Sequence, residues 1–205
     1  MNLILSLRKR LVMAKLYFSY SAMNAGKSTL LLQASYNYGE RGMKTILFTA
    51  KLDNRSKLGE ITSRIGLAEK AKTFEEQDNL FSIIENKISD YSISCILIDE
   101  AQFLTQKQVW ELSDVVDKLN IPVMCYGLRT DFQGKLFPGS ETLLSIADEL
   151  REIRTICDCG KKAIMVVRQD EKGKVIKEGE QIEIGGNDKY ISLCRFHWKS
   201  QMNKI

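Results

Sequence analysis

The 205-residue sequence has little histidine, little net charge and no long apolar segment. No run of residues is long enough to span a bilayer, so we expect no membrane partner. The net charge of +4 is small and spread along the chain, which favours a mixed-charge surface and argues against a nucleic-acid partner. One histidine is present, His197, and a lone histidine is more often packed or exposed than a metal ligand. There is no internal repeat and no low-complexity tract.

The first residues do not have the order of a secretory signal. A short apolar run precedes Arg8-Lys9-Arg10, whereas a signal places its basic residues first. Met13 is a plausible alternative start, so residues 1–13 are expected to be an N-terminal extension. We therefore predict a cytoplasmic protein, in which five cysteines are unlikely to form disulfides. Cys95 and Cys125 lie in apolar runs and are expected to be buried thiols.

A strand–loop–helix segment near the N-terminus has the layout of a phosphate-binding loop. An apolar strand at residues 16–20 leads into small residues ending in Gly26-Lys27-Ser28, and a helix follows to about residue 40. In such a loop backbone N–H groups surround phosphates, the lysine contacts the β and γ oxygens, and the serine hydroxyl can ligate Mg²⁺. The usual pattern begins with glycine where this chain has Ser21. The alternative reading is a turn before a helix.

The pattern that follows alternates between strands and helices. Further strands are predicted at residues 44–50, 93–100, 122–127 and 152–156, and helices at residues 75–88, 105–119 and 140–150. The helix near residue 105 begins with a capping box, Thr105 to Gln108. Residues 51–72 are polar and irregular, too long for a simple connector, and are expected to be functional, mobile or both. We predict an α/β domain at residues 14–150 and a smaller β-rich domain at residues 151–205.

Two carboxylates end the strand predicted at residues 93–100. Asp99 at this position is typical of a Walker-B-type site and can hold Mg²⁺. Adjacent residues of an extended strand point to opposite sides, so we expect Asp99 to face metal and Glu100 to face substrate, or the reverse. A second carboxylate can act as general base on an acceptor hydroxyl, or on water in an ATPase. The alternative is a strand that merely ends at the surface.

Four soft ligands occur as two short-spaced pairs outside the α/β domain. Cys157 and Cys159 form the first pair, and Cys194 and His197 form the second, separated by the 34 residues 160–193. This set suits a tetrahedral zinc site, although the one-residue spacer of the first pair is shorter than in most zinc fingers. No position remains for water, so the expected zinc is structural.

Taken together, these residues closely resemble the type II thymidine kinases, the cytosolic zinc-containing family related to the RecA-like ATPase core. The resemblance covers residues 14–198, and the short C-terminal tail indicates a bacterial-type member. Its signatures are residues 21–28, 99–103, 126–132 and 185–190 with the Cys-x-Cys and Cys-x-x-His pairs. It implies a RecA-like P-loop domain, a parallel sheet flanked by helices, with a small zinc-bound β-rich lasso domain.

The resemblance also implies roles for individual residues. Glu100 would be the general base toward the deoxyribose 5′-hydroxyl, and Mg²⁺ would bind at Ser28 and Asp99. The implied ATP-binding residues are Ser21, Ala22, Met23, Asn24, Ala25, Gly26, Lys27, Ser28, Asp53, Asn54, Arg55, Asp99, Glu100, Ala101 and Gln102. The implied thymidine-binding residues are Met23, Leu128, Phe132, Gln181, Ile182, Glu183, Ile184, Gly185 and Tyr190. Cys157, Cys159, Cys194 and His197 would bind zinc and anchor the lasso formed by residues 181–185.

The implied activity is transfer of the γ-phosphate of ATP to thymidine, with deoxyuridine as a further substrate, giving dTMP and ADP in nucleoside salvage. The family also implies a homotetramer and feedback inhibition by dTTP. The alternative hypothesis is a P-loop ATPase whose zinc-stabilised lobe binds nucleic acid, but the region after Cys157 has no dense basic stripe interleaved with aromatics. A nucleotide switch without catalysis is the third reading, and Glu100 beside Asp99 argues against it.

Overall fold

The computed structural model describes residues 13–52, 59–89, 92–182 and 189–204. The predicted N-terminal extension therefore lies outside the described residues, apart from Met13. The same holds for six predicted site residues, which are Asp53, Asn54, Arg55, Glu183, Ile184 and Gly185. Within the described part, no helix has both the length and the apolar character needed to cross a bilayer.

A six-stranded sheet forms the centre of the molecule. Its strands are β1 (Leu16–Ser21), β2 (Thr45–Ala50), β5 (Lys72–Phe74), β6 (Cys95–Ile98), β7 (Val123–Leu128) and β8 (Glu149–Glu152). They lie in the order β5-β2-β6-β7-β1-β8, and every neighbouring pair is parallel. Parallel neighbours require crossover connections, so their carboxyl ends share one edge of the sheet. The predicted α/β fold class is confirmed.

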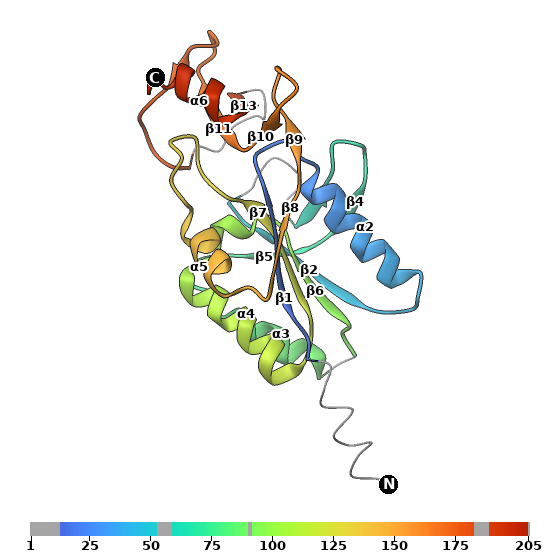
Figure 1. The fold of residues 1–205 in the computed structure, drawn as a ribbon. Helices are drawn as coiled ribbons and strands as arrows, with labels where there is room; N and C mark the ends of the chain where they lie inside the picture. The colour runs from blue at the N-terminus through green and yellow to red at the C-terminus, as the bar shows by residue number, and fades with distance from the viewer. Residues whose placement is uncertain (1–12, 53–58, 90–91, 183–188, 205) are drawn as a thin grey trace.

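Helices cover both faces of this sheet (Figure 1). α2 (Lys27–Gly39) packs on one face, where Leu31 and Leu32 join a core with Leu47 and Leu97. α3 (Leu80–Ile88), α4 (Gln106–Leu119) and α5 (Pro138–Ile146) cover the other face. Because helices cover both faces of the sheet, its strands carry apolar side chains on both sides, as is usual in parallel sheets.

The C-terminal part forms a separate lobe beyond the carboxyl edge of the sheet (Figure 1). It contains β9 (Thr155–Ile156), β10 (Lys162–Ala163), β11 (Met165–Gln169), β12 (Val175–Ile176), β13 (Tyr190–Leu193) and α6 (Arg195–Gln201). Its small core includes Val167, Leu193 and Trp198. The predicted boundary at residue 150 falls within β8, whose pairing with β1 continues to Glu152. The division into domains stays a prediction.

Two predicted helices have different bounds. The helix predicted from residue 75 begins at Leu80, because Asn79 caps it by accepting a hydrogen bond from the Ser82 N–H (2.8 Å). The helix predicted to residue 150 ends at Ile146, because the chain turns there to add β8 to the sheet. The strand predicted at residues 152–156 is divided between β8 and β9.

Residues 59–72, predicted as irregular, contain an antiparallel hairpin. Its strands are β3 (Glu60–Thr62) and β4 (Ala68–Lys70). The capping box at the start of α4 is confirmed, since the Gln108 N–H donates to Thr105 Oγ1 and the Thr105 N–H donates to Gln108 Oε1.

Candidate functional site

The predicted phosphate-binding loop connects β1 to α2 at the carboxyl edge of the sheet. Gly26 has φ 85°, a left-handed conformation that glycine adopts without steric cost, and it directly precedes the first turn of α2. The Lys27 side chain is buried and folds back over the loop, with Nζ 3.3 Å from Ser21 Oγ and 3.5 Å from the Ala22 carbonyl. The lysine ammonium and the N-terminal N–H groups of α2 therefore face the same space.

Ser21 fits the position where a glycine is usual. Its backbone does not have a positive φ, so a side chain costs nothing there. Its hydroxyl donates to the Ala22 carbonyl at 2.6 Å, and its own carbonyl accepts from the Arg129 N–H at 3.2 Å. Serine is therefore compatible with the backbone of this loop.

Asp99 lies directly opposite the loop. Its Oδ2 accepts a hydrogen bond from the Ser28 hydroxyl at 2.8 Å, and its Oδ1 accepts from the Glu100 N–H at 3.0 Å. Burial, reinforced by the negative charge of Glu100, raises the pKa of Asp99 to about 7, against the opposing effects of the Ser28 hydrogen bond and Lys27. Hydroxyl and carboxylate oxygens placed together beside a lysine are the donor set that Mg²⁺ takes with a bound polyphosphate.

Glu100 departs from the predicted geometry. β6 ends at Ile98, and Glu100 has φ 53° and ψ 39°, a left-handed conformation in which the opposite-sides argument for an extended strand does not hold. Its buried carboxylate accepts a hydrogen bond from Gln102 Nε2, and Gln102 Oε1 accepts from the Leu128 N–H at 2.9 Å. Left-handed backbone at a non-glycine residue is costly and is concentrated at functional sites.

Two cavities lie near this corner. The first, about 420 Å³, is lined by Glu100, by the loop from Met23 to Thr29 and, on its far side, by residues 60–65 of the β3–β4 hairpin. The second, about 560 Å³, is mainly apolar and includes Phe74, Phe103 and Phe137. Gln102 lines the second cavity and contacts Glu100, which lines the first. The hydrogen bond between Gln102 and Glu100 therefore connects the linings of the two cavities.

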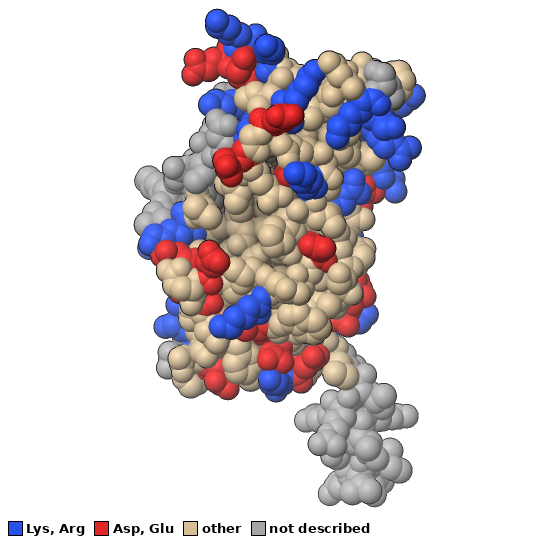
Figure 2. Space-filling view, turned by 90° about the vertical axis from the view of Figure 1, so that its left-hand side faces the viewer, with Lys and Arg blue, Asp and Glu red and all other residues tan. Residues whose placement is uncertain are grey.

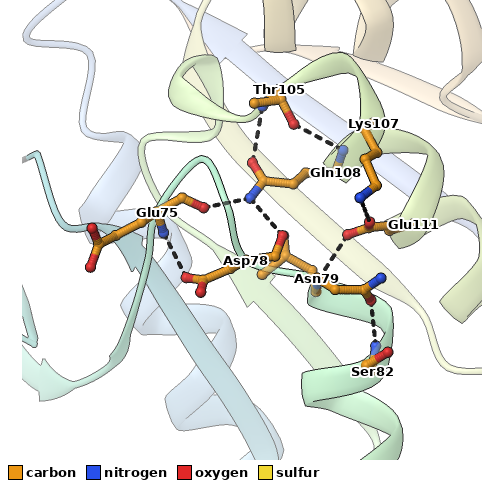
Figure 3. Close-up of polar contacts among 9 residues, drawn as sticks. Glu75, Asp78, Asn79, Ser82, Thr105, Lys107, Gln108 and Glu111 are labelled. Carbon is orange, nitrogen blue, oxygen red and sulfur yellow. Dashed lines mark hydrogen bonds and ion pairs between the residues drawn. The ribbon is translucent and has the colours of Figure 1, made fainter.

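A polar network fixes one wall of the second cavity (Figure 3). The Gln108 side chain donates to the carbonyls of Glu75 (2.7 Å) and Asp78 (3.1 Å), so the start of α4 holds the loop before α3. Glu111 Oε2 accepts from the Leu80 N–H at 2.8 Å in the same network. The helix predicted from residue 75 does not form before Leu80, because the carbonyls of Glu75 and Asp78 accept hydrogen bonds from Gln108 of α4.

The described residues among those predicted to bind the nucleoside lie in three sets of contacts. Met23, Leu128 and Tyr190 form one apolar cluster with Ala22 and Val166. The Phe132 ring is buried under the Arg168 guanidinium, 4.1 Å from its centroid. Gln181 Nε2 donates to Asp131 Oδ2 (3.0 Å) and to the Leu136 carbonyl (3.1 Å), and Ile182 lines the second cavity. Ala101 and Gln102, predicted to bind the nucleotide, are both buried.

Sequence reasoning missed three residues, one that lines the first cavity and two that contact predicted nucleoside-binding residues. Arg64 on the β3–β4 hairpin faces the phosphate loop, Arg168 covers Phe132, and the Ser192 hydroxyl donates to the Met23 carbonyl at 2.6 Å. The turn signal at Gly66 indicates a hairpin around Arg64. Nothing local in the sequence points to the other two, because their contacts join segments far apart in the chain.

The four predicted metal ligands come together in the C-terminal lobe. Their ligand atoms all lie within 4.8 Å of one another. The Sγ atoms of Cys159 and Cys194 are 3.8 Å apart, and Cys157 Sγ is 3.3 Å from His197 Nδ1. Ligands of a tetrahedral zinc lie about 3.8 Å apart for two thiolates and about 3.5 Å apart for thiolate and imidazole. The donor set therefore fits zinc.

The thiols of this cluster differ in acidity. Burial opposes ionisation of Cys157, but hydrogen bonds from the Cys159 and Cys194 backbone lower its pKa to about 6. A hydrogen bond from the Lys161 backbone favours the thiolate of Cys159, but burial and the neighbouring thiols together outweigh it and raise its pKa. All five cysteines, each in the described part of the chain, are free thiols, and Cys95 and Cys125 are buried as predicted.

The parallel sheet, the loop before α2 and the Asp99-Glu100 corner have the layout of the P-loop class of α/β proteins. The profile of the thymidine kinase family matches residues 14–198. The chain is 61% identical to a thymidine kinase from Agrobacterium fabrum, over 93% of this chain and 99% of the relative. It is 59% identical to one from Mannheimia succiniciproducens (94% and 99% covered) and 60% identical to one from Rhizobium meliloti (94% and 100%). The chain belongs to the thymidine kinase family.

Proposed function

We propose that this protein transfers the γ-phosphate of ATP to the 5′-hydroxyl of thymidine, giving dTMP and ADP, and that deoxyuridine is a second acceptor. The observation that carries the proposal is the position of Glu100. Its carboxylate lines the cavity formed by the phosphate loop and is held by Gln102, which lines a second, mainly apolar cavity. Phosphoryl transfer needs positioned groups and charge neutralisation more than covalent chemistry, and this arrangement offers both.

The nucleotide would bind in the first cavity. Residues 21–28 would surround the triphosphate, Lys27 would neutralise the β and γ oxygens, and Ser28 and Asp99 would hold Mg²⁺. The metal supplies charge neutralisation on the phosphate oxygens when it is bound. Asp53, Asn54 and Arg55, which lie outside the described residues, are proposed to approach the same triphosphate.

The nucleoside would bind beside Glu100, near Met23 and Leu128 of the first cavity. Glu100 would accept the proton of the 5′-hydroxyl as general base. Met23, Leu128, Phe132 and Tyr190 would contact the base, and residues 181–185 would close over it as a lasso. Gln181 supports this proposal, since its hydrogen bonds attach the start of that segment to Asp131 and Leu136.

Zinc would have a structural role in the C-terminal lobe. Three thiolates and one imidazole leave no coordination position for water or substrate. The lobe has a small core, and a metal would hold α6 against the turn that carries Cys157 and Cys159. Trp198 of α6 donates from Nε1 to the Phe132 carbonyl at 3.0 Å, so this support would extend to the proposed base pocket.

We extend the proposal to assembly, regulation and location. As a bacterial-type member of its family, the protein would form a homotetramer, would be inhibited by dTTP bound at the nucleoside site, and would act in the cytoplasm. Free cysteines agree with a reducing compartment.

The alternative, an ATPase with a nucleic-acid-binding lobe, is not favoured. Figure 2 shows Lys and Arg side chains interspersed with Asp and Glu on the face it presents, in place of a continuous basic groove. Non-specific binding of single strands depends on such a groove lined with stacking aromatics.

A nucleoside panel tests the proposal. The purified protein is incubated with ATP and Mg²⁺ plus thymidine, deoxyuridine, deoxycytidine, single-stranded DNA or no acceptor, and ADP release is measured. We expect release with thymidine, less with deoxyuridine, and only background with the others. ADP release that is independent of nucleoside, or stimulated by DNA, would overturn the proposal.

A further inference from the structure

The β3–β4 hairpin is anchored on the helix that carries the phosphate loop. Ile61 of β3 is 2% exposed and packs in one core with Leu31 and Leu32 of α2. Glu69 of β4 accepts a hydrogen bond at 3.0 Å from the hydroxyl of Ser35, also on α2. The base of the hairpin is therefore fixed relative to the loop at the start of α2.

The tip of the hairpin is an ordered turn. The Ser63 N–H donates to the Leu67 carbonyl at 2.8 Å, and the Leu67 N–H donates to Ser63 Oγ at 2.9 Å. Gly66 supplies the left-handed residue of the turn, with φ 89°. This turn directs Arg64 across the first cavity to the phosphate loop, where its Nη2 lies 2.5 Å from Asn24 Oδ1.

The described residues that line this cavity include fewer cations than acidic residues. Among its described lining residues, Lys27 and Arg64 are the cations, whereas Glu60, Asp99 and Glu100 are acidic. A nucleoside triphosphate would add about four negative charges at this place. Asn24 is a neutral partner, and it occupies one of the five N–H donors of the guanidinium, so the others are left to a phosphate.

We propose that Arg64 is a second phosphate-binding cation, which the β3–β4 hairpin places beside the triphosphate in addition to Lys27. The inference rests on the proposed nucleotide-binding role of the loop and adds a contact to it. Because Arg64 is exposed at a turn, its side chain is able to move from Asn24 to a phosphate oxygen, which is a stronger acceptor. The contact would favour triphosphate over diphosphate.

Titration calorimetry of Arg64→Ala tests this directly. The probes are a non-hydrolysable ATP analogue, AMP-PNP, and ADP, each with Mg²⁺ and without nucleoside. We expect AMP-PNP affinity to fall about tenfold or more and ADP affinity to fall less. Lys70→Ala, an exposed cation on the same hairpin outside the cavity, is the matched control and should match the wild type.

Asn24→Gly separates a phosphate contact from mere support of the hairpin. Glycine tolerates the left-handed backbone of Asn24 (φ 62°) and removes only the neutral partner of Arg64. It should lose less AMP-PNP affinity than Arg64→Ala. Equal losses in the two variants, or AMP-PNP affinity in Arg64→Ala within twofold of wild type, would overturn the inference. Thymidine-dependent ADP release by the wild type is measured separately. If thymidine is not the acceptor, the AMP-PNP affinities of the variants still test the role of Arg64.

Discussion

Gln102 joins the Glu100 carboxylate to the end of β7. Its amide nitrogen donates to Glu100 while its amide oxygen accepts from the Leu128 N–H at 2.9 Å, and the residue is 1% exposed. Because both ends of its amide are hydrogen-bonded, Gln102 fixes the position of the Glu100 carboxylate. The backbone of Glu100 itself has the less favourable left-handed conformation. We therefore expect Gln102 to position Glu100, while its predicted nucleotide-binding role stays a prediction.

Gln102→Leu keeps the volume of this side chain and removes both hydrogen bonds. We expect kcat for thymidine phosphorylation to fall about 10- to 100-fold, because Glu100 is no longer held toward the acceptor. The affinity for AMP-PNP should change little. Steady-state kinetics and calorimetry measure the two effects, and Gln106→Leu at an exposed position of α4 is the control. A large loss of AMP-PNP affinity with unchanged kcat would support the nucleotide-binding role instead.

Glu100→Gln tests the general base itself. The amide keeps the size of the side chain but does not accept a proton, so thymidine-dependent ADP release should fall about 100- to 10,000-fold. Nucleotide binding should persist, since Lys27, Ser28 and Asp99 are unchanged. Full activity in this variant would exclude Glu100 as the base.

The sequence predicted the elements whose signals are local. The apolar run of β1, the small residues before Lys27 and the capping box at Thr105 each define structure over a few residues, and all three appear where expected. The four zinc-ligand candidates were also found from spacing alone, and the structure brings them together.

What the sequence did not predict depends on distant partners. The helix expected from residue 75 starts late because Gln108, on another helix, binds the carbonyls of the preceding turn. The extended backbone assumed for Glu100 was wrong, because this residue has a left-handed conformation, and the direction of its side chain stays a prediction. Arg64 was predicted only as part of a polar, irregular segment, since its contact with Asn24 joins residues 40 positions apart.

Gly139 allows α5 to approach the 3₁₀ turn of residues 101–103 that follows Glu100. A Cβ at Gly139 would lie 2.6 Å from the Ala101 carbonyl and 2.7 Å from the Leu104 carbonyl, closer than real contacts allow. Gly139→Ala should therefore lower the free energy of unfolding by about 1–3 kcal/mol and reduce activity by shifting this turn. Gly39→Ala is the control, because a Cβ there meets nothing within 4 Å. Thermal or urea unfolding measures the difference, and equal stability of the two variants would contradict the packing argument.

Removal of zinc should affect the nucleoside more than the nucleotide. We expect about one zinc per chain by elemental analysis, and almost none in Cys194→Ala, whereas Cys95→Ala should keep its metal. Loss of zinc loosens α6 and with it the Trp198–Phe132 hydrogen bond, so the KM for thymidine should rise while AMP-PNP affinity changes less. Purified wild-type protein without zinc would contradict the four-ligand assignment.

Alkaline pH should destabilise the fold through its buried thiols. Burial raises the pKa of Cys95 to about 12 from an ordinary value of 9.0, so above pH 9 the unfolded chain loses this proton while the folded chain retains it. The unfolded state then binds fewer protons, and the free energy of unfolding falls by about 1.4 kcal/mol per pH unit for this group until pH 12.

Cys95→Ala is expected to be less stable than wild type at pH 7, but the difference should shrink as pH rises from 9 to 11. Val123→Ala, which creates a cavity in the same sheet without removing an ionisable group, should show a constant difference in urea unfolding over this range. Parallel curves for Cys95→Ala and wild type would show that Cys95 does not carry this pH dependence.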